Sequence, residues 1–126
     1  MSDLLHRQVP QALIQAGLVS SQAFSPQKRE DYGLSVSQGH MVTARRSFEL
    51  HTHAGFKSAG VWSVTEVECA ELKLPVIPEP TTEPYVNEAH AIIQFSKTSR
   101  PERKQCAQEL ARRANARGVQ YSAESD

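Results

Sequence analysis

The sequence predicts an α+β fold, a single domain over residues 1–126 with a small mixed sheet of about four strands and three to four helices. This length fits one domain and leaves no room for a second. Helical patterns alternate along the chain with short apolar runs, an order typical of one sheet packed against helices. No apolar run approaches the roughly 20 residues that a membrane span needs.

Four short segments are predicted to be strands. They are residues 4–9, 34–37, 59–64 and 90–95. The third segment is apolar on both faces, which favours a central position in the sheet. The fourth alternates between apolar and more polar residues, as a strand with one covered face does. A short final strand is expected at residues 119–121.

The clearest predicted helix lies near the C-terminus. Ser99 and Glu102 form a capping box, and Pro101 sits in the first turn, where its missing N–H costs nothing. Gly118 supplies the stop. The helix between these signals carries small apolar residues at four-residue spacing, which permits close packing on a sheet.

Three further helices are predicted. Thr65 and Glu68 form a second capping box, and the helix that they begin ends before Pro75. A third helix is expected over residues 44–52. A short fourth helix is expected over residues 10–16, with Pro10 in its first turn and Gly17 as the stop.

Residues 74–88 hold four of the seven prolines, and we predict a proline-rich extended crossing there. Residues 122–126 are expected to be a flexible tail. Cys69 and Cys106 lie on apolar helix faces, which predicts buried free thiols. Two cysteines do not make a disulfide framework, and the charged N-terminal segment does not resemble a secretory signal. A soluble, cytoplasmic protein is therefore expected.

The charges sum to zero, with 14 Lys and Arg against 14 Asp and Glu, but they are segregated. Residues 66–88 are acidic and residues 100–117 are basic. The two segments either face each other within the fold or face different partners. The neutral total argues against a protein that coats DNA.

Three arginines fall along one side of the C-terminal helix, because their separations are close to whole multiples of 3.6 residues. They are Arg103, Arg113 and Arg117. Two interpretations follow: a solvated helix face, which comes first, and contact of these arginines with a partner, which comes second. A protein partner is favoured over nucleic acid, since this helix carries no aromatic residue on which a base would stack.

Polar residues gather in the N-terminal third. His6 and Arg7 lie in an apolar strand, where burial is costly unless each has a partner. Ser20 and Ser21 follow the stop at Gly17, and their hydroxyls and backbone N–H groups suit an anion. Ser35 lies on the next predicted strand. The competing interpretation is an edge strand followed by a plain serine turn.

Over about the first 40 residues this layout resembles the ADP-ribosyltransferase superfamily, which places a His or Arg on its first strand, then a short helix ending in Gly. The resemblance implies an NAD- or nucleotide-binding site. The residues that it implies are His6, Arg7, Ser20, Ser21, Ser35 and, as the acid, Glu66. Glu66 departs from the family pattern, because it opens a predicted helix instead of lying on a late strand.

No metal site is predicted. His51 and His53 are two residues apart in a predicted helix, so their side chains point to nearly opposite sides. No phosphate-binding glycine loop and no metal-ligand spacing appears. No cofactor is expected, with NAD as the alternative under the resemblance above.

The whole chain also resembles a group of small uncharacterised bacterial proteins. The motifs that carry this resemblance are SSQAF at residues 20–24, LSV at 34–36, HAIIQF at 90–95 and RG at 117–118. It implies a self-contained bacterial cytoplasmic domain.

Three functions follow, in order of preference. The first is a small accessory or immunity-type protein that binds a macromolecular partner without catalysis. The second is a minimal ADP-ribosyltransferase-like domain that binds NAD or a nucleotide. The third is an RNA-associated protein that uses its basic C-terminal helix. Enzymatic activity is left open, with a non-enzyme preferred.

Overall fold

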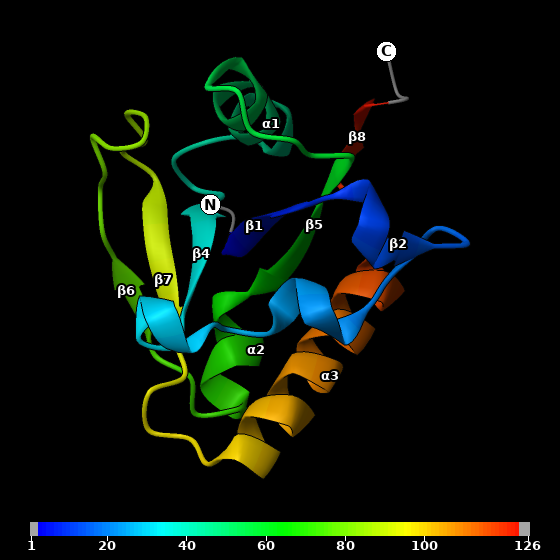
Figure 1. The fold of residues 1–126 in the computed structure, drawn as a ribbon, viewed down its shortest axis with the longest axis vertical. Helices are drawn as coiled ribbons and strands as arrows, with labels where there is room; N and C mark the ends of the chain where they lie inside the picture. Colours follow the sequence, from blue (N-terminus) through cyan, green and yellow to red (C-terminus); the bar gives the residue numbers. More distant parts are fainter. Residues whose placement is uncertain (1–2, 124–126) are drawn as a thin grey trace.

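The computed structural model describes residues 3–123, and its main feature is a six-stranded sheet in the order β6-β7-β4-β1-β5-β8 (Figure 1). The strands are β1 (Leu4–Val9), β4 (Gly33–Gln38), β5 (Gly60–Thr65), β6 (Val76–Pro78), β7 (His90–Gln94) and β8 (Tyr121–Ser122). The four predicted strands correspond to β1, β4, β5 and β7. The α+β class is confirmed, but the predicted number of about four strands is too low.

The prediction of a mixed sheet is wrong, because every pairing is antiparallel. Helix α1 (Ala44–His53) connects β4 to β5, which is the connection expected between parallel neighbours. Strand β1 lies between these two strands and is antiparallel to both. Strands β4 and β5 therefore run in the same direction, but they do not pair with each other because β1 lies between them.

Two short edge strands account for the additional members of the sheet. Strand β6 forms inside the proline-rich segment 74–88, for which no element is predicted, and pairs with β7. Its proline is tolerated because β6 is an edge strand. Strand β8 pairs with β5 at the opposite edge, slightly later than the strand expected at residues 119–121. It includes Ser122, and residues 124–126 of the expected tail lie outside the described residues.

Three predicted α-helices are confirmed. They are α1, α2 (Glu66–Glu71) and α3 (Arg100–Arg117), with Thr43, Thr65 and Ser99 as their N-caps. Both predicted capping boxes form, at α2 and at α3. Each box satisfies two backbone N–H groups that would otherwise lack a partner at the helix start.

The helix predicted over residues 10–16 is wrong. Only η1 (Gln11–Leu13) is helical there, as a single 3-10 turn, and a hairpin of β2 (Ile14–Gln15) and β3 (Leu18–Val19) follows. Ala16 and Gly17 have φ angles of 54° and 78°, which close a two-residue hairpin turn. The glycine that indicates a helix stop in the sequence is instead the turn. Two more 3-10 helices, η2 (Ser21–Phe24) and η3 (Lys28–Glu30), precede β4.

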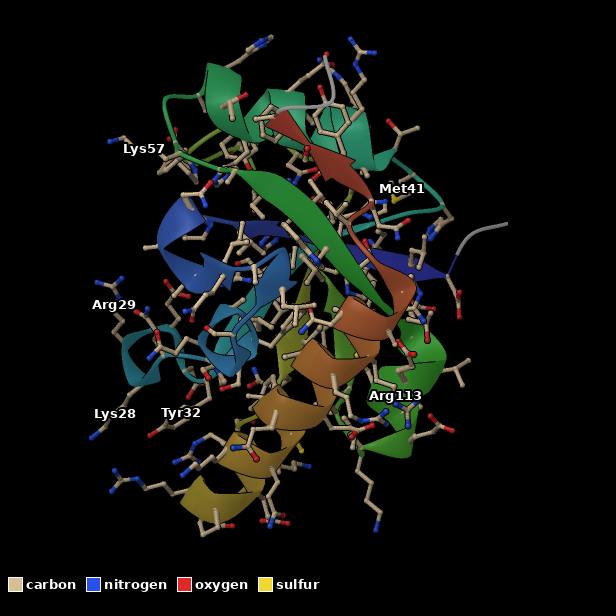
Figure 2. The ribbon with its side chains drawn as sticks, turned by 90° about the vertical axis from the view of Figure 1, so that its right-hand side faces the viewer. Lys28, Arg29, Tyr32, Met41, Lys57 and Arg113 are labelled. Carbon is tan, nitrogen blue, oxygen red and sulfur yellow. The ribbon has the colours of Figure 1, made fainter. Side chains whose placement is uncertain are left out.

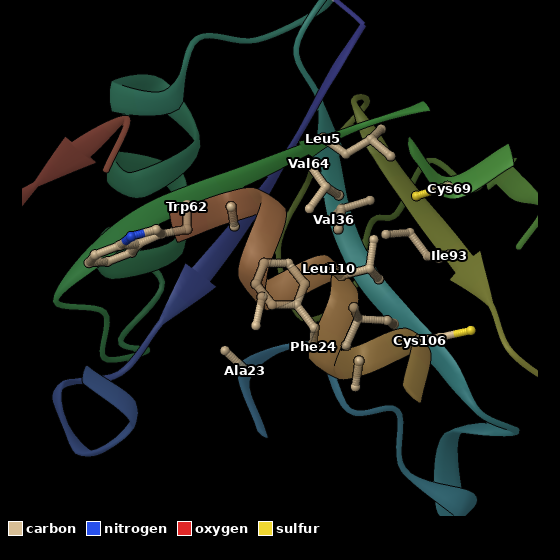
Figure 3. Packing of buried hydrophobic residues seen from close by; sticks show 14 of the residues in the cluster. Leu5, Ala23, Phe24, Val36, Trp62, Val64, Cys69, Ile93, Cys106 and Leu110 are labelled. Atoms are coloured by element: carbon tan, nitrogen blue, oxygen red, sulfur yellow. The ribbon is translucent and has the colours of Figure 1, made fainter. Parts of the chain in front are cut away.

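The hydrophobic core lies between one face of the sheet and the layer made by α3 and η2 (Figure 3). Leu5 of β1, Val36 of β4 and Ile93 of β7 point into it. Phe24 and Leu110 meet them from η2 and α3. Because side chains alternate along a strand, the residues between these apolar positions lie on the other face of the sheet.

The other face of the sheet is covered only in part. Helix α1 packs over β1, β5 and β8. Strands β4 and β7 lie farther toward β6, and in Figure 1 no helix of the described residues covers their second face there. Within residues 3–123 no helix has the length and apolarity to cross a bilayer.

Candidate functional site

A cleft of about 770 Å³ lies on the partly covered face of the sheet. Strands β1, β4 and β7 form its floor. The end of α1 with the residues that follow it forms one wall, and the segment of residues 79–87 forms the other. The volume lies within the range of small-molecule sites in proteins.

The floor is polar because the alternate strand positions that face it carry polar side chains. His6 and Gln8 come from β1, and Ser35 and Ser37 come from β4. From β7 the floor receives His90, Ile92 and Gln94. The predicted cluster of His6, Arg7 and Ser35 is therefore brought together in one cleft, as the interpretation of a binding site requires.

Arg7 occupies a gap in the sheet. Pairing between β1 and β4 is confined to Leu5 with Gln38 and His6 with Ser37. Beyond it the Arg7 guanidinium donates from Nε to the Ala23 carbonyl and from Nη1 to the Ser35 carbonyl, both at 2.9 Å. The guanidinium thereby donates to two backbone carbonyls, as the N–H groups of a paired strand would do in a continuous sheet.

The charge of Arg7 has no close counter-ion in the described part of the chain. Burial lowers the pKa of Arg7, and attraction to Glu30 at longer range offsets part of this effect. An arginine stays protonated in a protein despite such a shift. Its two hydrogen-bond partners are neutral carbonyls. A partly buried cation in this state favours an anion beside it.

Aromatic side chains from the two walls meet at one end of the cleft, and we call this group the aromatic wall. The ring of His51 stacks on Phe56 with centroids 5.2 Å apart, and Phe56 lies 6.0 Å from the ring of Tyr85. The Tyr85 hydroxyl lies 3.2 Å from His51 Nδ1. Phe56 is 42% exposed. Lys57 follows it in the chain and also borders the cleft.

Both His6 and His51 favour the neutral form. Burial lowers the pKa of His6 more than a backbone hydrogen bond at Val42 raises it. Burial also lowers the pKa of His51, against a backbone hydrogen bond at Lys57, and the positive charge of Arg7 lowers it further. His6 Nδ1 lies 2.7 Å from the buried Ser63 hydroxyl. Both imidazoles border the cleft, and His6 is the more tightly held of the two because it is nearly fully buried.

Lowering the pH from 7.5 to 5.5 is expected to reduce the free energy of unfolding, in part through His6. The folded-state pKa of His6 is lowered from 6.5. The unfolded chain therefore takes up the proton first, and stability is lost as the pH falls from about 6.5 through the folded-state pKa. Urea unfolding at both pH values measures the difference.

The His6→Gln variant should show a smaller loss over this pH interval than the wild-type protein. His40→Gln, at an exposed histidine outside the cleft, is the matched control and should leave the loss unchanged. An equal loss in wild type and His6→Gln would show that the buried imidazole does not carry the effect.

The other residues of the predicted cluster lie elsewhere. Ser20 is exposed and caps η2 by accepting a hydrogen bond from the Gln22 N–H. Ser21 lines a different hollow, beside α3. Glu66 begins α2 and is exposed, and it does not border the cleft. The acid implied by the ADP-ribosyltransferase resemblance is thus separated from His6 and Arg7.

The three arginines predicted to contact a partner have different roles. Arg117 binds Glu68 through two nitrogens and donates to the Ser63 carbonyl. Arg113 forms ion pairs with Glu71 and Glu109. These contacts tie the basic C-terminal segment to the acidic one within the fold, the first of the two arrangements expected from the charge pattern. Arg103 belongs to the hollow beside α3.

The described residues were also compared with what a metal site or a reactive thiol needs. Residues 3–123 contain no group of three His, Cys, Asp or Glu side chains that could hold a metal. Cys69 and Cys106 are buried and unbonded, as predicted. Burial raises the pKa of Cys69 to about 12, so the thiolate that acts as a nucleophile is scarce at neutral pH.

Sequence reasoning missed Phe56 and Tyr85, which give the cleft its aromatic wall. Tyr85 lies in the proline-rich segment, where an aromatic residue among prolines was the available signal. Comparison of the chain with family models, with curated proteins and with solved structures finds no match. The geometry of the cleft is therefore the basis on which function is inferred.

Proposed function

We propose that the protein binds a small nucleotide-class molecule in the cleft, with one anionic group at Arg7 and a planar ring beside Phe56 and Tyr85. The observation that carries this proposal is the state of Arg7. Its partly buried guanidinium bonds only to carbonyls at the floor of a cleft large enough for a ligand. An anionic ligand would supply the missing counter-charge.

The aromatic wall supports a ring-bearing ligand. His51, Phe56 and Tyr85 already contact one another, with Phe56 stacked on His51 and Tyr85 tilted against both, so the exposed ring of Phe56 is held in place for a ligand ring to stack on. A base or similar ring that stacks on such a surface gains about 1–3 kcal/mol. Ser35 and the other polar residues of the floor suit the hydroxyls of a sugar.

The charged side chains that border the cleft favour a ligand with few negative charges. Arg7 and Lys57 border the cleft, and so do four carboxylates: Glu30, Asp31, Glu79 and Glu83. These acids would repel a polyanion. A nucleoside monophosphate or NAD therefore fits better than a nucleoside triphosphate. The proposal contains no transfer step, since the acid suggested by the sequence, Glu66, does not border the cleft.

The proposal retains the cytoplasmic setting expected from the sequence, because unbonded thiols such as Cys69 and Cys106 suit a reducing compartment. A protein partner remains the alternative. Its support is weaker, since Arg113 and Arg117 are engaged by acids of the same chain.

Calorimetric titration of the purified protein with AMP, NAD, ATP and adenosine tests the proposal. AMP is expected to bind at least about tenfold more tightly than adenosine, because adenosine lacks the group that would pair with Arg7. ATP is expected to bind more weakly than AMP. Phe56→Ala should weaken AMP binding about tenfold, the equivalent of one lost stacking contact.

Val67→Ala is the matched control, because Val67 is an apolar residue that is 60% exposed on α2, away from the cleft. It should leave AMP affinity unchanged. No heat with any of the four compounds at millimolar concentration would remove the proposal. Equal affinity for AMP and adenosine would remove the role of Arg7.

A further inference from the structure

A second hollow, of about 470 Å³, lies outside the cleft. It lies between the start of α3, the segment formed by η2 and the residues after it, and the turn that precedes β4. Its lining residues are Ser21, Ser25, Pro26, Tyr32, Arg100, Arg103 and Lys104. Three of these seven are cations and none is an acid, whereas the chain as a whole is neutral.

The centre of this hollow is a stack of Arg103 on Tyr32. The guanidinium carbon of Arg103 lies 4.0 Å from the centroid of the Tyr32 ring. Arg103 Nη1 also donates to the Thr98 carbonyl at 2.8 Å, which fixes the plane of the guanidinium. An arginine that stacks on a ring keeps its charge, and Arg103 is partly exposed, so its guanidinium is accessible from the hollow.

The neighbouring cations follow from helix geometry. Arg100, Arg103 and Lys104 are three and four residues apart, so they share one face of the first turns of α3. Within residues 3–123 none of the three forms an ion pair with a carboxylate. Lys28 and Arg29 of η3 lie on the same side of the molecule as Tyr32 (Figure 2).

The carboxylates closest in sequence to the hollow do not pair with its cations. Glu102 accepts a hydrogen bond from the Ser99 N–H in the capping box of α3. Glu30 and Asp31 border the cleft and do not line the hollow. The cations of the hollow are therefore available to an external anion, in contrast to Arg113 and Arg117 farther along α3.

We propose that this hollow binds single-stranded nucleic acid. Backbone phosphates contact Arg100 and Lys104, and one base stacks on the outer face of Arg103 above Tyr32. A cationic groove beside a stacking surface is the combination with which proteins hold single strands independently of sequence. The aromatic partner, Tyr32, comes from the turn just before β4, so it is not visible in the sequence of the helix. This site is separate from the cleft and does not depend on the function proposed there.

The test is fluorescence anisotropy of the full chain with a labelled ten-nucleotide RNA of mixed sequence, with single-stranded DNA of the same sequence, and with the duplex of that RNA and its complement. Binding is expected to weaken steeply between 50 and 200 mM KCl. The double variant Arg100→Gln/Lys104→Gln should lower the slope of log K against log salt by about 1.4, since each phosphate contact on a single strand contributes about 0.7.

Two variants separate stacking from charge. Arg103→Lys keeps the charge but removes the flat surface, and it should weaken RNA binding about tenfold with little change in the salt slope. Arg46→Gln/Lys73→Gln changes the net charge as much as the first double variant, at exposed residues outside the hollow. It should leave RNA binding near that of the wild-type protein. Circular dichroism checks that each variant is folded.

Several outcomes would overturn the proposal. They are no binding at 50 mM KCl with 100 μM protein, equal losses in the Arg46/Lys73 control, and equal affinity for duplex and single strand. A polyglutamate peptide that competes as well as unlabelled RNA would identify the hollow as a docking surface for acidic proteins instead. AMP affinity of the Arg100/Lys104 variant should stay unchanged, so a failure here is distinguishable from a failure of the cleft proposal.

Discussion

Replacing Phe24 with alanine is expected to lower the free energy of unfolding by about 4 kcal/mol, within the range measured for buried Phe→Ala changes. Phe24 has no exposed surface and projects from η2 against α3, beside Leu110 (Figure 3). The substitution leaves a cavity that the surrounding strands and α3 fill only by moving. Urea unfolding at neutral pH, followed by circular dichroism, measures the change.

The control is the same substitution at Phe56, which is 42% exposed on the wall of the cleft. Phe56→Ala should cost less than about 1 kcal/mol, because little packing is lost. If Phe24→Ala does not fold, Phe24→Leu is expected to fold with a loss of about 1–2 kcal/mol, since the smaller cavity removes fewer contacts. Equal effects at the two phenylalanines would contradict the core described here.

The helices were predictable because short local sequence motifs define where they begin. Thr65 with Glu68 and Ser99 with Glu102 each satisfy backbone N–H groups within four residues of sequence, and both capping boxes form. The central strands were predictable for a similar reason, since β5 is a mostly apolar run that is buried on both faces.

The remaining parts of the fold depend on contacts between distant residues. Strand β6 pairs with β7 across a long loop, and β8 reaches β5 only after α3 has crossed the sheet. At Ala16 and Gly17 the local signal fits either a helix stop or a hairpin turn, and the pairing of β2 with β3 decides between them. Propensity is a weak predictor where tertiary pairing selects the conformation.

The candidate site was predictable in part. His6, Arg7 and Ser35 meet in the cleft because β1 and β4 are neighbours, an arrangement that the polar residues of the first 40 positions suggested. Ser20, Ser21 and Glu66 do not join them. The role of Arg7 depends on where strand pairing stops, and the aromatic wall depends on residues 56 and 85 approaching across the cleft. Neither feature leaves a periodic signal in the sequence.

The pair of Glu68 and Arg117 is expected to show a coupling free energy of about 2 kcal/mol in a double-mutant cycle of Glu68→Gln and Arg117→Met. Arg117 Nη2 lies 2.8 Å from Glu68 Oε2, and Nη1 lies 3.1 Å from Oε1. The side chain of Glu68 is only 11% exposed and that of Arg117 is 26% exposed. Removing either partner leaves the other charge partly buried. Urea unfolding of the four proteins at pH 7 measures the coupling.

The matched control is the pair of Glu109 and Arg112 on the surface of α3, where Arg112 is 66% exposed. Its coupling should be clearly smaller than that of Glu68 with Arg117, because solvent screens an exposed pair. Equal couplings in the two cycles would show that burial adds nothing to the Glu68 contact.

The coupling should also depend on pH in a defined direction. Burial alone would raise the pKa of Glu68, but hydrogen bonds from Arg117 and Thr65 outweigh it and hold the pKa below 4.5. The unfolded chain is therefore protonated first, so the contribution of Glu68 is complete above about pH 4.5 and is lost as the pH falls through the folded-state pKa. Because this contact joins α2 and β5 to the end of α3, its loss should loosen the last turn of α3 before the core around Phe24 opens, which faster hydrogen exchange of the amides in that turn in acid would detect.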